Sequence, residues 1–553
     1  MINRQTRLGK PPNWPPGLPL TMHVPQTTLF DNLRISAERY PDKPAVVYGR
    51  HVMTWRELLQ SAESIAGWLQ KTCGVGRGDR VLLYGQNSPH FIIAYHAILR
   101  AEAVVVPVNP MNLTEEVAYF AEDSGARILI GGSELFPVVA PLLDVTIAHA
   151  LLFTYSEGLG DEAPAAPDWV RAPRPTIDNP SISHWSDALA AEFHPESYEG
   201  KSTDLCIIPY TSGTTGRSKG CRHTHRSMMM GCVTPAIWRS NTPESVFLGV
   251  APLFHLLGLQ GSVNCSTFLG STMVLLPRWD AEAAAELIET WQVSHWGAAP
   301  PMLMDILSGS ALQKHDISSL QVVTGGGAGM PETVNKRLKE ELGIIYLEGW
   351  GMTETASMAM ANPPQRPKLQ CLGIPTFGVE ARVIDPDTLT ELSTGEVGEL
   401  VVCGEQVMLG YWNNHQADLE TFIEIDGKRF LRTGDLVRRD EDGYYFMVDR
   451  LKRMINTGGF KVWPLEVETV LFRHPAIQEA CVIASQDERR GEVVKALVVK
   501  RASAGDISAE QIIEWSRAQM AAYKCPRIVS FVDALPRSGT GKIDWRRMQD
   551  HES

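Results

Sequence analysis

The sequence predicts a mixed α/β protein with a separate, smaller α+β domain near its C-terminus. Two observations lead to this prediction. Over most of the chain, short apolar segments of strand length alternate with amphipathic segments of helix length. After Asp449 the pattern changes to paired strand segments around a charged turn. The length of 553 residues is several times that of one domain, so we expect at least two domains.

The first clear alternation begins at Arg80. The segment "RVLLYG" is typical of a buried strand, "SPHFIIAYHAILRAEA" of a helix opened by Ser88 and Pro89, and "VVVPVNP" of another buried strand. Together they predict a β-α-β unit. Further along, "ARILIGG" and "SLQVVTGGG" indicate strands, whereas "DAEAAAELIETW" and "PETVNKRLKEEL" indicate helices.

Two other regions differ from this alternation. Between Leu142 and Pro195 the chain is rich in Pro, Ala and Asp with weak periodicity, and we expect surface excursions with short elements there. Beyond Asp449, "EACVIASQDERRGEVVKALVVK" predicts two strands around a charged turn, and "SAEQIIEWSRAQMAAY" predicts an amphipathic helix.

Composition and charge exclude several classes of protein. The net charge of -13 opposes whole-molecule attraction to nucleic acid or an anionic membrane. The most apolar long segment is interrupted by Arg100 and Glu102, so we expect no transmembrane segment. The polar, proline-rich N-terminus lacks the apolar core of a signal peptide, and the nine cysteines are scattered, so we expect a cytoplasmic protein with reduced thiols.

The stretch "YTSGTTGRSKGCRHTHRS" carries the strongest chemical signal. Its glycines allow close backbone approach, its threonines and serines supply hydroxyl donors for phosphate oxygens, and Lys219 adds positive charge. The order of residues is not the Walker pattern, which excludes a P-loop NTPase. We therefore predict a phosphate-binding loop, with a flexible polar turn as the alternative.

This loop resembles the phosphate-binding loop of the adenylate-forming superfamily, which includes acyl-CoA synthetases, firefly luciferase and the adenylation domains of peptide synthetases. Similar motifs follow in the family's order: "APLFHLLG", "TGGGAGMP", "LEGWGMTETA", "RTGDL", "VDRLKRMINTGGFKVWPLEVE" and "PRSGTGKIDWRRM". The resemblance covers nearly the whole chain. One departure is Ser218, where the family usually has proline.

The resemblance implies a fold and a division into domains. We expect a large N-terminal domain, residues 1–449, made of two similar α/β subdomains plus a small β-barrel. A small mobile C-terminal α+β domain, residues 450–553, would follow, with its hinge near 450–453 at Lys452. A solvated basic linker is the alternative interpretation of Lys452.

The resemblance also assigns the nucleotide site. Trp350 would stack on the base, and Thr353 would lie near the α-phosphate. Asp435 would accept both ribose hydroxyls, although an Asx turn is the alternative. The residues expected to bind ATP or AMP are Thr211, Ser212, Gly213, Thr214, Thr215, Gly216, Lys219, Gly325, Gly326, Gly327, Gly349, Trp350, Gly351, Met352, Thr353, Asp435 and Arg450.

Metal and catalytic groups follow from the same motifs. Glu354, with Thr214, would hold Mg2+, a cation that takes oxygen ligands alongside substrate phosphates; an ordinary exposed carboxylate is the alternative for Glu354. Lys542 matches the family's catalytic lysine, whose ammonium would neutralise charge between the carboxylate and the α-phosphate.

The expected coenzyme A contacts are Gly458 and Gly459. Asn456 departs from the lysine of several relatives, which leaves the help for the thioester step open.

The acid-binding pocket is less defined by sequence. His255 would lie beside the carboxylate or act as a gate, and a core histidine is its alternative interpretation. The residues expected to line the pocket are His255, Gly258, Gly261, Ser262, Trp296 and Gly327. Trp296 would shorten the pocket if it faced it. His223, His225 and Cys221 could suggest zinc, but they lack a fourth ligand, and capping of the turn is the preferred interpretation.

The implied function is an ATP-dependent acyl-CoA synthetase of lipid metabolism. It would convert a medium- to long-chain fatty acid to an acyl-adenylate with pyrophosphate release, and then transfer the acyl group to coenzyme A with AMP release. Alternatives are a ligase for short, branched or aryl acids and, more remotely, a luciferase-like oxygenase or an inactive nucleotide-binding module. ATP, Mg2+ and coenzyme A are the expected cofactors. A homodimer is expected only by analogy.

Overall fold

We describe the protein from a computed structural model, which covers residues 13–160, 166–211, 217–326, 330–457, 460–487, 490–502, 504–537 and 542–552. The structure divides into two compact units. The first comprises the chain up to Glu380 together with Cys403–Arg429, and the second comprises Ala381–Val402 together with the chain from Phe430 onward. Within the described ranges, no helix combines the length and apolarity needed to cross a bilayer.

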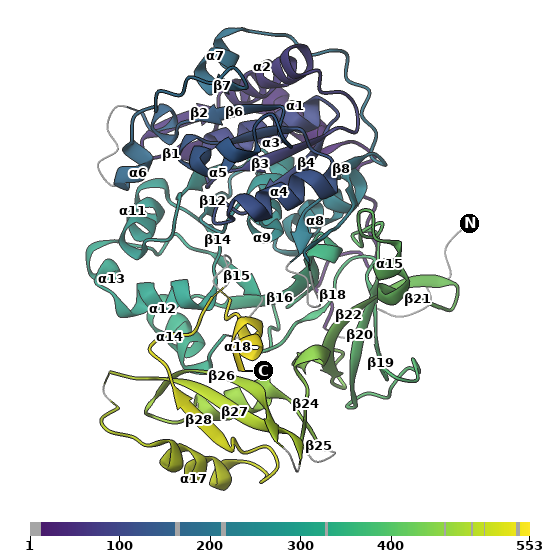
Figure 1. The fold of residues 1–553 in the computed structure, drawn as a ribbon, viewed down its shortest axis with the longest axis vertical. Coiled ribbons are helices and arrows are strands. Elements are labelled where there is room, and N and C mark those ends of the chain that lie inside the picture. Colours follow the sequence, from purple (N-terminus) through teal and green to yellow (C-terminus); the bar gives the residue numbers. More distant parts are fainter. Residues whose placement is uncertain are drawn as a thin grey trace. The chain divides into compact units, whose positions relative to one another are not determined.

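The first unit contains a seven-stranded, mainly parallel sheet (Figure 1). The predicted β-α-β unit is confirmed within it, because its two strands pair in parallel and α3 (Pro89–Arg100) connects them. The Ser88 hydroxyl caps that helix by accepting a hydrogen bond from the Phe91 amide. From edge to edge the strands are β11 (His223–Thr224), β8 (Leu205–Ile207), β4 (Val104–Val108), β3 (Arg80–Tyr84), β5 (Ile128–Gly132), β6 (His149–Phe153) and β7 (Ile182–His184).

Two strands of this sheet correct the sequence interpretation. The region between Leu142 and Pro195 was expected to hold surface excursions with short elements, and two of its short elements, β6 and β7, instead extend the central sheet in parallel register. Strand β6 is buried over four of its five residues. Its composition is ordinary for a strand, but the Pro-rich segments around it obscured so short an apolar run.

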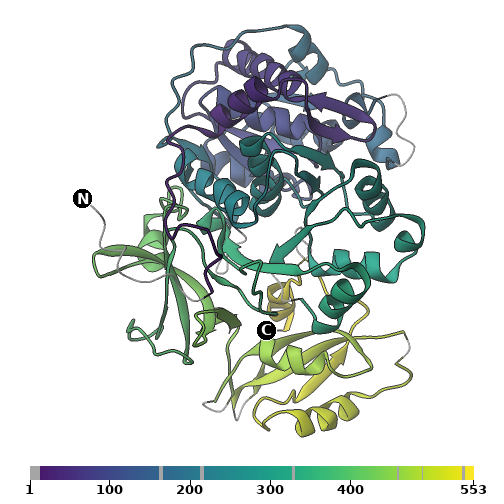
Figure 2. The same cartoon turned by 180° about the vertical axis from the view of Figure 1, so that it is seen from behind.

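Helices cover this sheet and connect its strands. α1 (Leu29–Arg39) and α2 (Trp55–Cys73) pack against each other and against α3 (Figure 2). Residues of α4 (Thr114–Ser124) belong to the core that includes β3, β4 and β5. The remaining short helices of this region are the 3-10 helices η2 (Ser133–Leu135), η3 (Ala140–Leu142) and η4 (Tyr155–Gly158), and α5 (Phe136–Val139), α6 (Asp168–Arg171) and α7 (Trp185–Ala190).

A second sheet of nine strands also belongs to the first unit. Its central strands, from β1 through β16, run parallel, and antiparallel strands flank both edges. The predicted strand at "SLQVVTGGG" is therefore confirmed. In spatial order the strands are β18 (Ile374–Pro375), β17 (Ser357–Ala361), β16 (Tyr346–Met352), β15 (Val322–Gly326), β14 (His295–Gly297), β12 (Val246–Gly249), β13 (Thr272–Leu275), β1 (Pro44–Tyr48) and β2 (His51–Thr54).

The two faces of this second sheet are covered by different helices. One face packs on the helices between β13 and β16, and Figure 1 shows these helices gathered beside β14–β16. They are α11 (Ala281–Trp291), α12 (Pro300–Ser308), α13 (Ala311–Lys314) and α14 (Glu332–Leu342). The other face is covered by α8 (His225–Trp238), the π-helix η5 (Leu259–Asn264) and α10 (Cys265–Leu269). Both α11 and α14 were predicted from sequence.

Short elements complete the first unit. They are the hairpin of β9 (Tyr210–Thr211) and β10 (Lys219–Gly220), α9 (Leu256–Gly258), the 3-10 helix η6 (Thr353–Thr355), α15 (His415–Thr421) and β21 (Phe422–Ile425).

The second unit contains two arrangements of strands, the first antiparallel and the second mixed. The first is formed by β19 (Glu380–Ile384), β20 (Val397–Cys403), β22 (Lys428–Arg439) and β23 (Tyr445–Arg450). A 3-10 helix, η7 (Leu451–Arg453), leads to the second, whose strands are β25 (Phe460–Val462), β24 (Ile455–Thr457), β27 (Gly491–Lys500), β26 (Ile477–Asp487) and β28 (Ile528–Phe531). The predicted strand pair after Asp449 is confirmed as β26 and β27.

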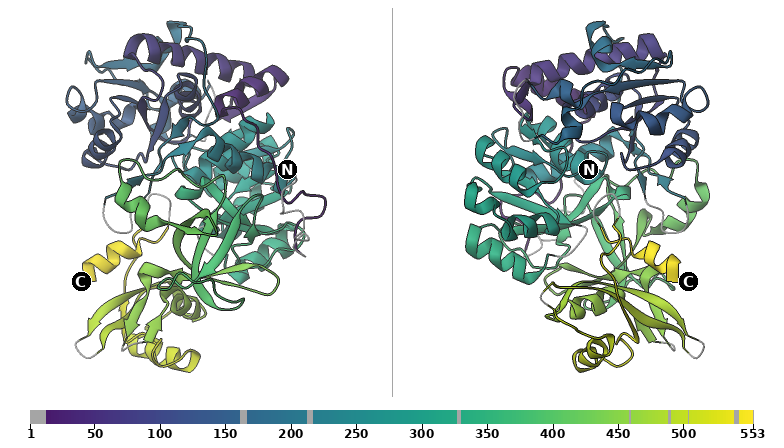
Figure 3. Two further views of the ribbon diagram at one scale, coloured as in Figure 1. Left: turned by 90° about the vertical axis from the view of Figure 1, so that its right-hand side faces the viewer. Right: turned by 60° about the vertical axis from the view of Figure 1, so that its left-hand side comes forward.

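Three helices pack on this last sheet. They are α16 (Pro464–Leu471), α17 (Ala509–Gln519) and α18 (Trp545–Glu552). α17 is the predicted amphipathic helix, and Ser508 forms a capping box at its start. Figure 3 shows α18 beside β26, to which Gln549 is joined by hydrogen bonds with the Ala484 backbone. The chain passes from the first to the second sheet of this unit near 450–453, where the hinge was expected. The boundaries between the two compact units lie at other positions in the chain.

Candidate active site

The β9–β10 hairpin frames the predicted phosphate-binding loop. Thr211 pairs with Lys219 across the hairpin, so the ammonium of Lys219 is held at its base. The loop is anchored from outside by Tyr119, whose hydroxyl donates to the Ser218 carbonyl at 2.7 Å. The predicted donors Ser212, Gly213, Thr214, Thr215 and Gly216 lie outside the described residues, so their role stays a prediction.

A buried hydrogen-bonded arrangement connects this loop to the predicted magnesium ligand. The Tyr411 hydroxyl donates to Oε1 of Glu354 at 2.8 Å, and Nζ of Lys219 lies 4.5 Å from the centroid of the Tyr411 ring. Glu354 is only 7% exposed, so the structure excludes the alternative of an ordinary exposed carboxylate. Tyr411 was missed by the sequence analysis, because a tyrosine in "MLGYWNN" carries no signal of its contact with Glu354.

Backbone hydrogen bonds fix Tyr411 beside the loop. The Trp412 amide donates to the Gly220 carbonyl at 2.7 Å, and Arg222 exchanges backbone hydrogen bonds with Leu409 and Gly410. An isolated β-bridge between Cys221 and Tyr411 lies in the middle of this contact. Segments nearly two hundred residues apart thus form one rigid wall of the site.

The turn that carries Thr353 and Glu354 has an unusual backbone. Ala356 and Ser357 both adopt positive φ, of 50° and 91°, which is costly for residues with a side chain. Gly351 is required opposite, because a Cβ there would lie 1.5 Å from the Ser357 carbonyl oxygen. Trp350, expected to stack on a base, is 8% exposed in β16. This strained turn holds the "GMTET" motif in one conformation.

His223 supports the same turn from beneath. Its Nε2 lies 2.7 Å from the Thr353 carbonyl, which only accepts hydrogen bonds, so Nε2 carries the proton. Burial lowers the pKa of His223 to about 4, although the Thr353 carbonyl partly opposes that change. His225 instead accepts a hydrogen bond from the Leu29 amide at its Nδ1. His223 therefore supports the Thr353 turn, whereas His225 joins the start of α8 to the start of α1.

The face of the second sheet that α8 covers presents backbone rather than side chains near its carboxyl edge. Phe247 packs on Ala236 of α8 and on His295, so His295 is on this face, and Gly297, two residues on, shares it. The strand pairing places Thr324, Gly326 and Gly349 on this face as well. A Cβ at Gly297, or at Gly261 of η5, would meet no atom within 4 Å. Space therefore exists on this side of the sheet.

Two residues expected to line the acid pocket do not open onto this space. Trp296 alternates with His295 and Gly297, so it points to the opposite face; it is 2% exposed and stacks on Trp279 in the core. The hypothesis that Trp296 shortens the pocket is wrong. Gly258 leaves no room either, because a Cβ there would lie 2.3 Å from the Pro252 carbonyl oxygen. A glycine is needed at position 258 because the backbone of Pro252 packs closely against it.

The other pocket predictions have varied outcomes. His255 caps α9, since its Nδ1 accepts a hydrogen bond from the Leu257 amide at 3.2 Å. Ser262 is buried and faces β12, near Gly249. Gly325 points to the face with Tyr346, where a Cβ would clash with the tyrosine hydroxyl. Gly327 lies outside the described residues.

The second unit brings three predicted residues together. Nε of Arg450 lies 3.1 Å from Oδ1 of Asp435, and the two residues are paired across β22 and β23. Partial desolvation and the Arg450 guanidinium lower the pKa of Lys542, which Asp435 opposes. Asp435 is 2% exposed, whereas the Arg450 side chain is 49% exposed. One carboxylate and two cations thus form a single electrostatic cluster.

The expected hinge has an anchor that the sequence did not reveal. Asp449 is buried and accepts hydrogen bonds from the Arg450 and Leu465 amides. Nη2 of Arg453 lies 2.5 Å from Oε1 of Glu468. Burial alone would lower the pKa of Arg453, but Glu468 and Asp449 raise it above its ordinary value.

Lys452 lies between these anchored residues and is exposed. Its role as a hinge stays a prediction. Asn456 is exposed on β24, and its backbone amide donates to Glu492 at 2.7 Å. Gly458 and Gly459, the expected coenzyme A contacts, lie outside the described residues.

Comparison with known proteins decides the family. Residues 33–412 match the family described as AMP-binding enzyme, and residues 466–542 match the AMP-binding enzyme C-terminal domain. The chain belongs to the AMP-binding enzyme family. It is an AMP-forming acid–CoA ligase with the fold of the adenylate-forming superfamily, and this confirms the resemblance seen in its motifs.

Individual relatives of the ligase differ in the acid they use. It is 31% identical to the long-chain-fatty-acid–CoA ligase of Bacillus subtilis (strain 168), over 98% of this chain and 97% of that protein. It is 33% identical to a feruloyl-CoA synthase of an Amycolatopsis species, over 92% and 95% of the two chains. The crystal structure of ATP-bound MatB from Rhodopseudomonas palustris superimposes with a TM-score of 0.83 at 28% identity, covering 95% of this chain and 99% of that one. The ligase therefore uses ATP, coenzyme A and a small carboxylic acid.

Proposed function

We propose that the ligase activates an elongated, largely apolar carboxylic acid of the fatty-acid class, of medium to long chain. The acid's carboxylate attacks the α-phosphorus of ATP, an acyl-adenylate forms, and pyrophosphate leaves. The thiol of coenzyme A then attacks the acyl carbonyl, loses its proton, and AMP leaves with both electrons of the broken bond. The long-chain-fatty-acid–CoA ligase of Bacillus subtilis, similar over nearly the whole chain, supports this substrate class.

The observation that carries the proposal is the open space on the α8-covered face of the second sheet. A Cβ at Gly297 on this face of the sheet, or at Gly261 in the covering helix η5, would meet no atom within 4 Å. Apolar side chains, including Leu347 and Met358, continue along the same side of the sheet. A slender apolar chain lying against glycine backbone fits such a surface.

Residues of the described site take separate roles in this proposal. Lys219 binds the phosphate end of ATP, and Tyr411 holds Glu354 in place. Asp435 accepts the ribose hydroxyls while Arg450 orients it. Lys542 supplies positive charge to the oxygens between the acid and the α-phosphate during adenylation. The C-terminal domain then rotates about Lys452, and this rotation allows the thioester step.

Magnesium is part of the proposal. The Glu354 carboxylate, with hydroxyls of the phosphate-binding loop, is the kind of oxygen donor that Mg2+ takes together with ATP phosphates and water. Among the described residues no group of three or more His, Cys, Asp or Glu could hold a metal by itself. Bound there, Mg2+ would neutralise phosphate charge, and Tyr411 would fix the direction of the Glu354 ligand.

A second candidate function is a ligase for aryl acids. Gly297, Gly326 and Gly349 present flat backbone on one side of the sheet, and a planar ring packs well on such a surface. The similarity to a feruloyl-CoA synthase over most of the chain agrees with this alternative. Chain length and ring content of the acid therefore separate the two candidates.

The test is CoA-dependent AMP formation with ATP and Mg2+ across acids from acetate to palmitate, plus benzoate and cinnamate. We expect the highest kcat/KM with medium- to long-chain acids and thioesters confirmed by mass. A maximum with the aryl acids would favour the second candidate instead. Lys542→Ala serves as the control, because it should lose AMP formation while still converting a supplied acyl-adenylate and coenzyme A to the thioester.

A further inference from the structure

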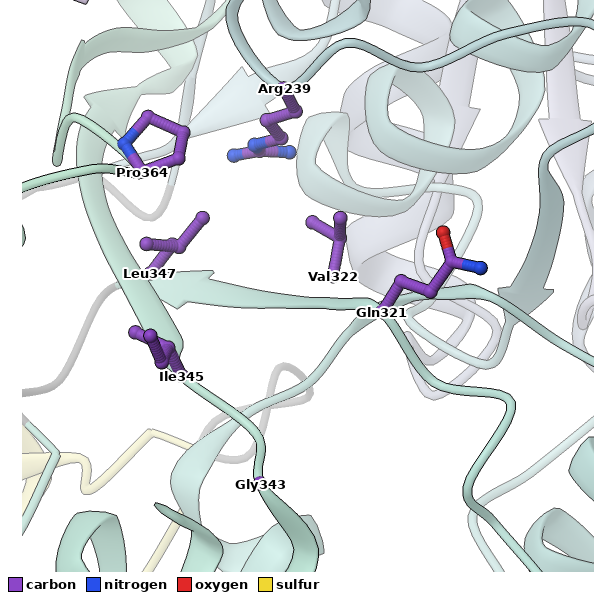
Figure 4. Close-up of a pocket in the computed structure, with 7 residues that line it drawn as sticks. All are labelled: Arg239, Gln321, Val322, Gly343, Ile345, Leu347 and Pro364. Atoms are coloured by element: carbon purple, nitrogen blue, oxygen red, sulfur yellow. The ribbon is translucent and has the colours of Figure 1, made fainter.

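A small cavity lies at the amino ends of β15 and β16, opposite to the edge that carries the glycine motifs (Figure 4). Its volume of about 190 Å³ gives room for a carboxylate group and several waters. Most of its wall is apolar, and its only charged residue is an arginine. The lining residues are Arg239, Gln321, Val322, Gly343, Ile345, Leu347 and Pro364.

Arg239 directs its guanidinium into this cavity. Figure 4 shows the group pointing into the space between Pro364, Leu347 and Val322. Nη2 of Arg239 lies 3.3 Å from the sulfur of Met358, and among the described residues no carboxylate forms an ion pair with the guanidinium. Burial lowers the pKa of Arg239 to about 10, and Cys265 opposes this only in part. The guanidinium nevertheless stays charged at neutral pH.

A structural role accounts poorly for this arrangement. Arg239 follows the last turn of α8, where a cation interacts favourably with the helix dipole. That interaction is weak, and a half-buried guanidinium beside apolar side chains attracts an anion more strongly than one in open water does. An arginine is also the side chain best suited to bind a carboxylate through two parallel hydrogen bonds. An anionic ligand group would supply the missing partner.

The cavity lies on the same face of the sheet as Gly326 and Gly349. Val323 and Tyr346 belong to the core on the opposite face, so Val322 and Leu347 point toward α8, as do Gly326 and Gly349. The five residues from Val322 to Gly326 span about 13 Å of extended strand. His295 is on the same face, and Arg239 contributes to lowering its pKa. An acid extended along this face from the glycine edge would have its far end beside Arg239.

We propose that this cavity receives a second carboxylate, at the far end of the acid, so that the ligase prefers elongated dicarboxylic acids over simple fatty acids. The inference rests on the proposed function, because it specifies the acid that the same site activates. Arg239 binds the distal carboxylate, Gln321 borders the cavity with a neutral amide, and the apolar side chains between them contact the methylene chain. One carboxylate is activated while the other is held.

The test compares pairs of acids with equal chain length, such as dodecanoate and dodecanedioate, in CoA-dependent AMP formation. In the unaltered ligase we expect the diacid to have the higher kcat/KM, with one preferred length in a series from adipate to tetradecanedioate. Arg239→Met should lower kcat/KM for the diacid by about 10-fold or more, because the distal carboxylate loses its charge-assisted hydrogen bonds, and should leave the monoacid unaffected. Lys336→Met, which removes an exposed cation on α14, is the matched control and should change neither.

Other outcomes have separate meanings. Equal loss with both acids in Arg239→Met, or no preference for any diacid in the unaltered enzyme, overturns the inference and leaves the proposed function intact. Another outcome is that added acetate increases the rate with monoacids in the unaltered enzyme but not in Arg239→Met. That result would show that a free anion occupies the cavity, and it would also overturn the inference. Absence of AMP formation with every acid contradicts the proposed function itself. If Arg239→Met does not fold, the length series in the unaltered enzyme still decides.

Discussion

At the scale of single residues, Tyr411 is the side chain whose removal most directly tests the geometry around Glu354. Tyr411→Phe removes the hydroxyl that donates to Glu354 and keeps the ring beneath Lys219. A buried hydrogen bond to a charged group contributes about 1.5–3 kcal/mol, so we expect a similar loss of stability. Because Glu354 loses its orientation, kcat for adenylation should fall about tenfold or more, and the Mg2+ concentration for half-maximal rate should rise.

A matched variant distinguishes an effect on the orientation of Glu354 from a general loss of stability. Tyr84→Phe also removes a buried tyrosine hydroxyl, which donates to the Asn112 carbonyl at 2.6 Å in the same unit. It should lower stability, measured by urea unfolding, without changing the Mg2+ dependence. An unchanged Mg2+ dependence in Tyr411→Phe would contradict the role given to Tyr411.

The same scale shows what sequence could and could not predict. Local motifs were enough to propose Lys219, Glu354, Asp435 and Arg450, whose binding roles stay predictions; the structure shows Lys219 and Glu354 beside Tyr411, and Asp435 paired with Arg450. Tyr411 could not be found, since its contact with Glu354 depends on pairing between Cys221 and Tyr411, distant in sequence. Trp296 was assigned to the wrong side of the sheet, because only the observed strand register shows which of two alternating residues faces α8.

At the scale of elements, α9 and the π-helix η5 place two glycines in opposite environments. Gly258→Ala would bring a methyl group within 2.3 Å of the Pro252 carbonyl oxygen, so the segment must shift. We expect a loss of about 2–4 kcal/mol in the free energy of unfolding, in the range of severe backbone and packing changes. Because η5 borders the acid-binding space, KM for the acid should rise as well.

Gly261→Ala is the control within the same segment. Its Cβ would meet no atom, and its φ is not positive, so stability should be kept or increased by about 0.5–1 kcal/mol through helix propensity. Thermal unfolding of the two variants and KM for the preferred acid are the measurements. Similar destabilisation by both would contradict the difference in packing.

Elements were predicted better than their arrangement. The helices and strands with clear periodicity, such as α3, α11, α17 and the β26–β27 pair, were identified from local sequence. Strands β6 and β7 were not, because five and three residues amid Pro-rich segments carry too little pattern, and their pairing partner supplies the stabilisation. The anchor of Asp449, Arg453 and Glu468 likewise needs the fold to bring its charges together.

At the scale of the whole molecule, the first unit buries several histidines in neutral form. Burial is the main cause of lowered pKa in each: to about 3 in two of them and to about 4 in three. Since an unfolded histidine titrates near 6.5, the folded state binds fewer protons between that value and about 4. These residues are His90, His96, His223, His225 and His295.

The consequence is a specific dependence of stability on pH. The contribution of these histidines is fully present above pH 6.5 and is lost as the pH falls, because protons then bind the unfolded chain preferentially. Each histidine contributes a slope of about 1.4 kcal/mol per pH unit within its window. We therefore expect the midpoint of urea unfolding of the first unit to shift steeply to lower urea concentration as the pH falls from 6.5 to 4.

His96→Gln should reduce this slope by the equivalent of one proton, whereas His415→Gln, at an exposed position, should not. A slope unchanged by His96→Gln would mean that buried histidines do not cause the acid sensitivity.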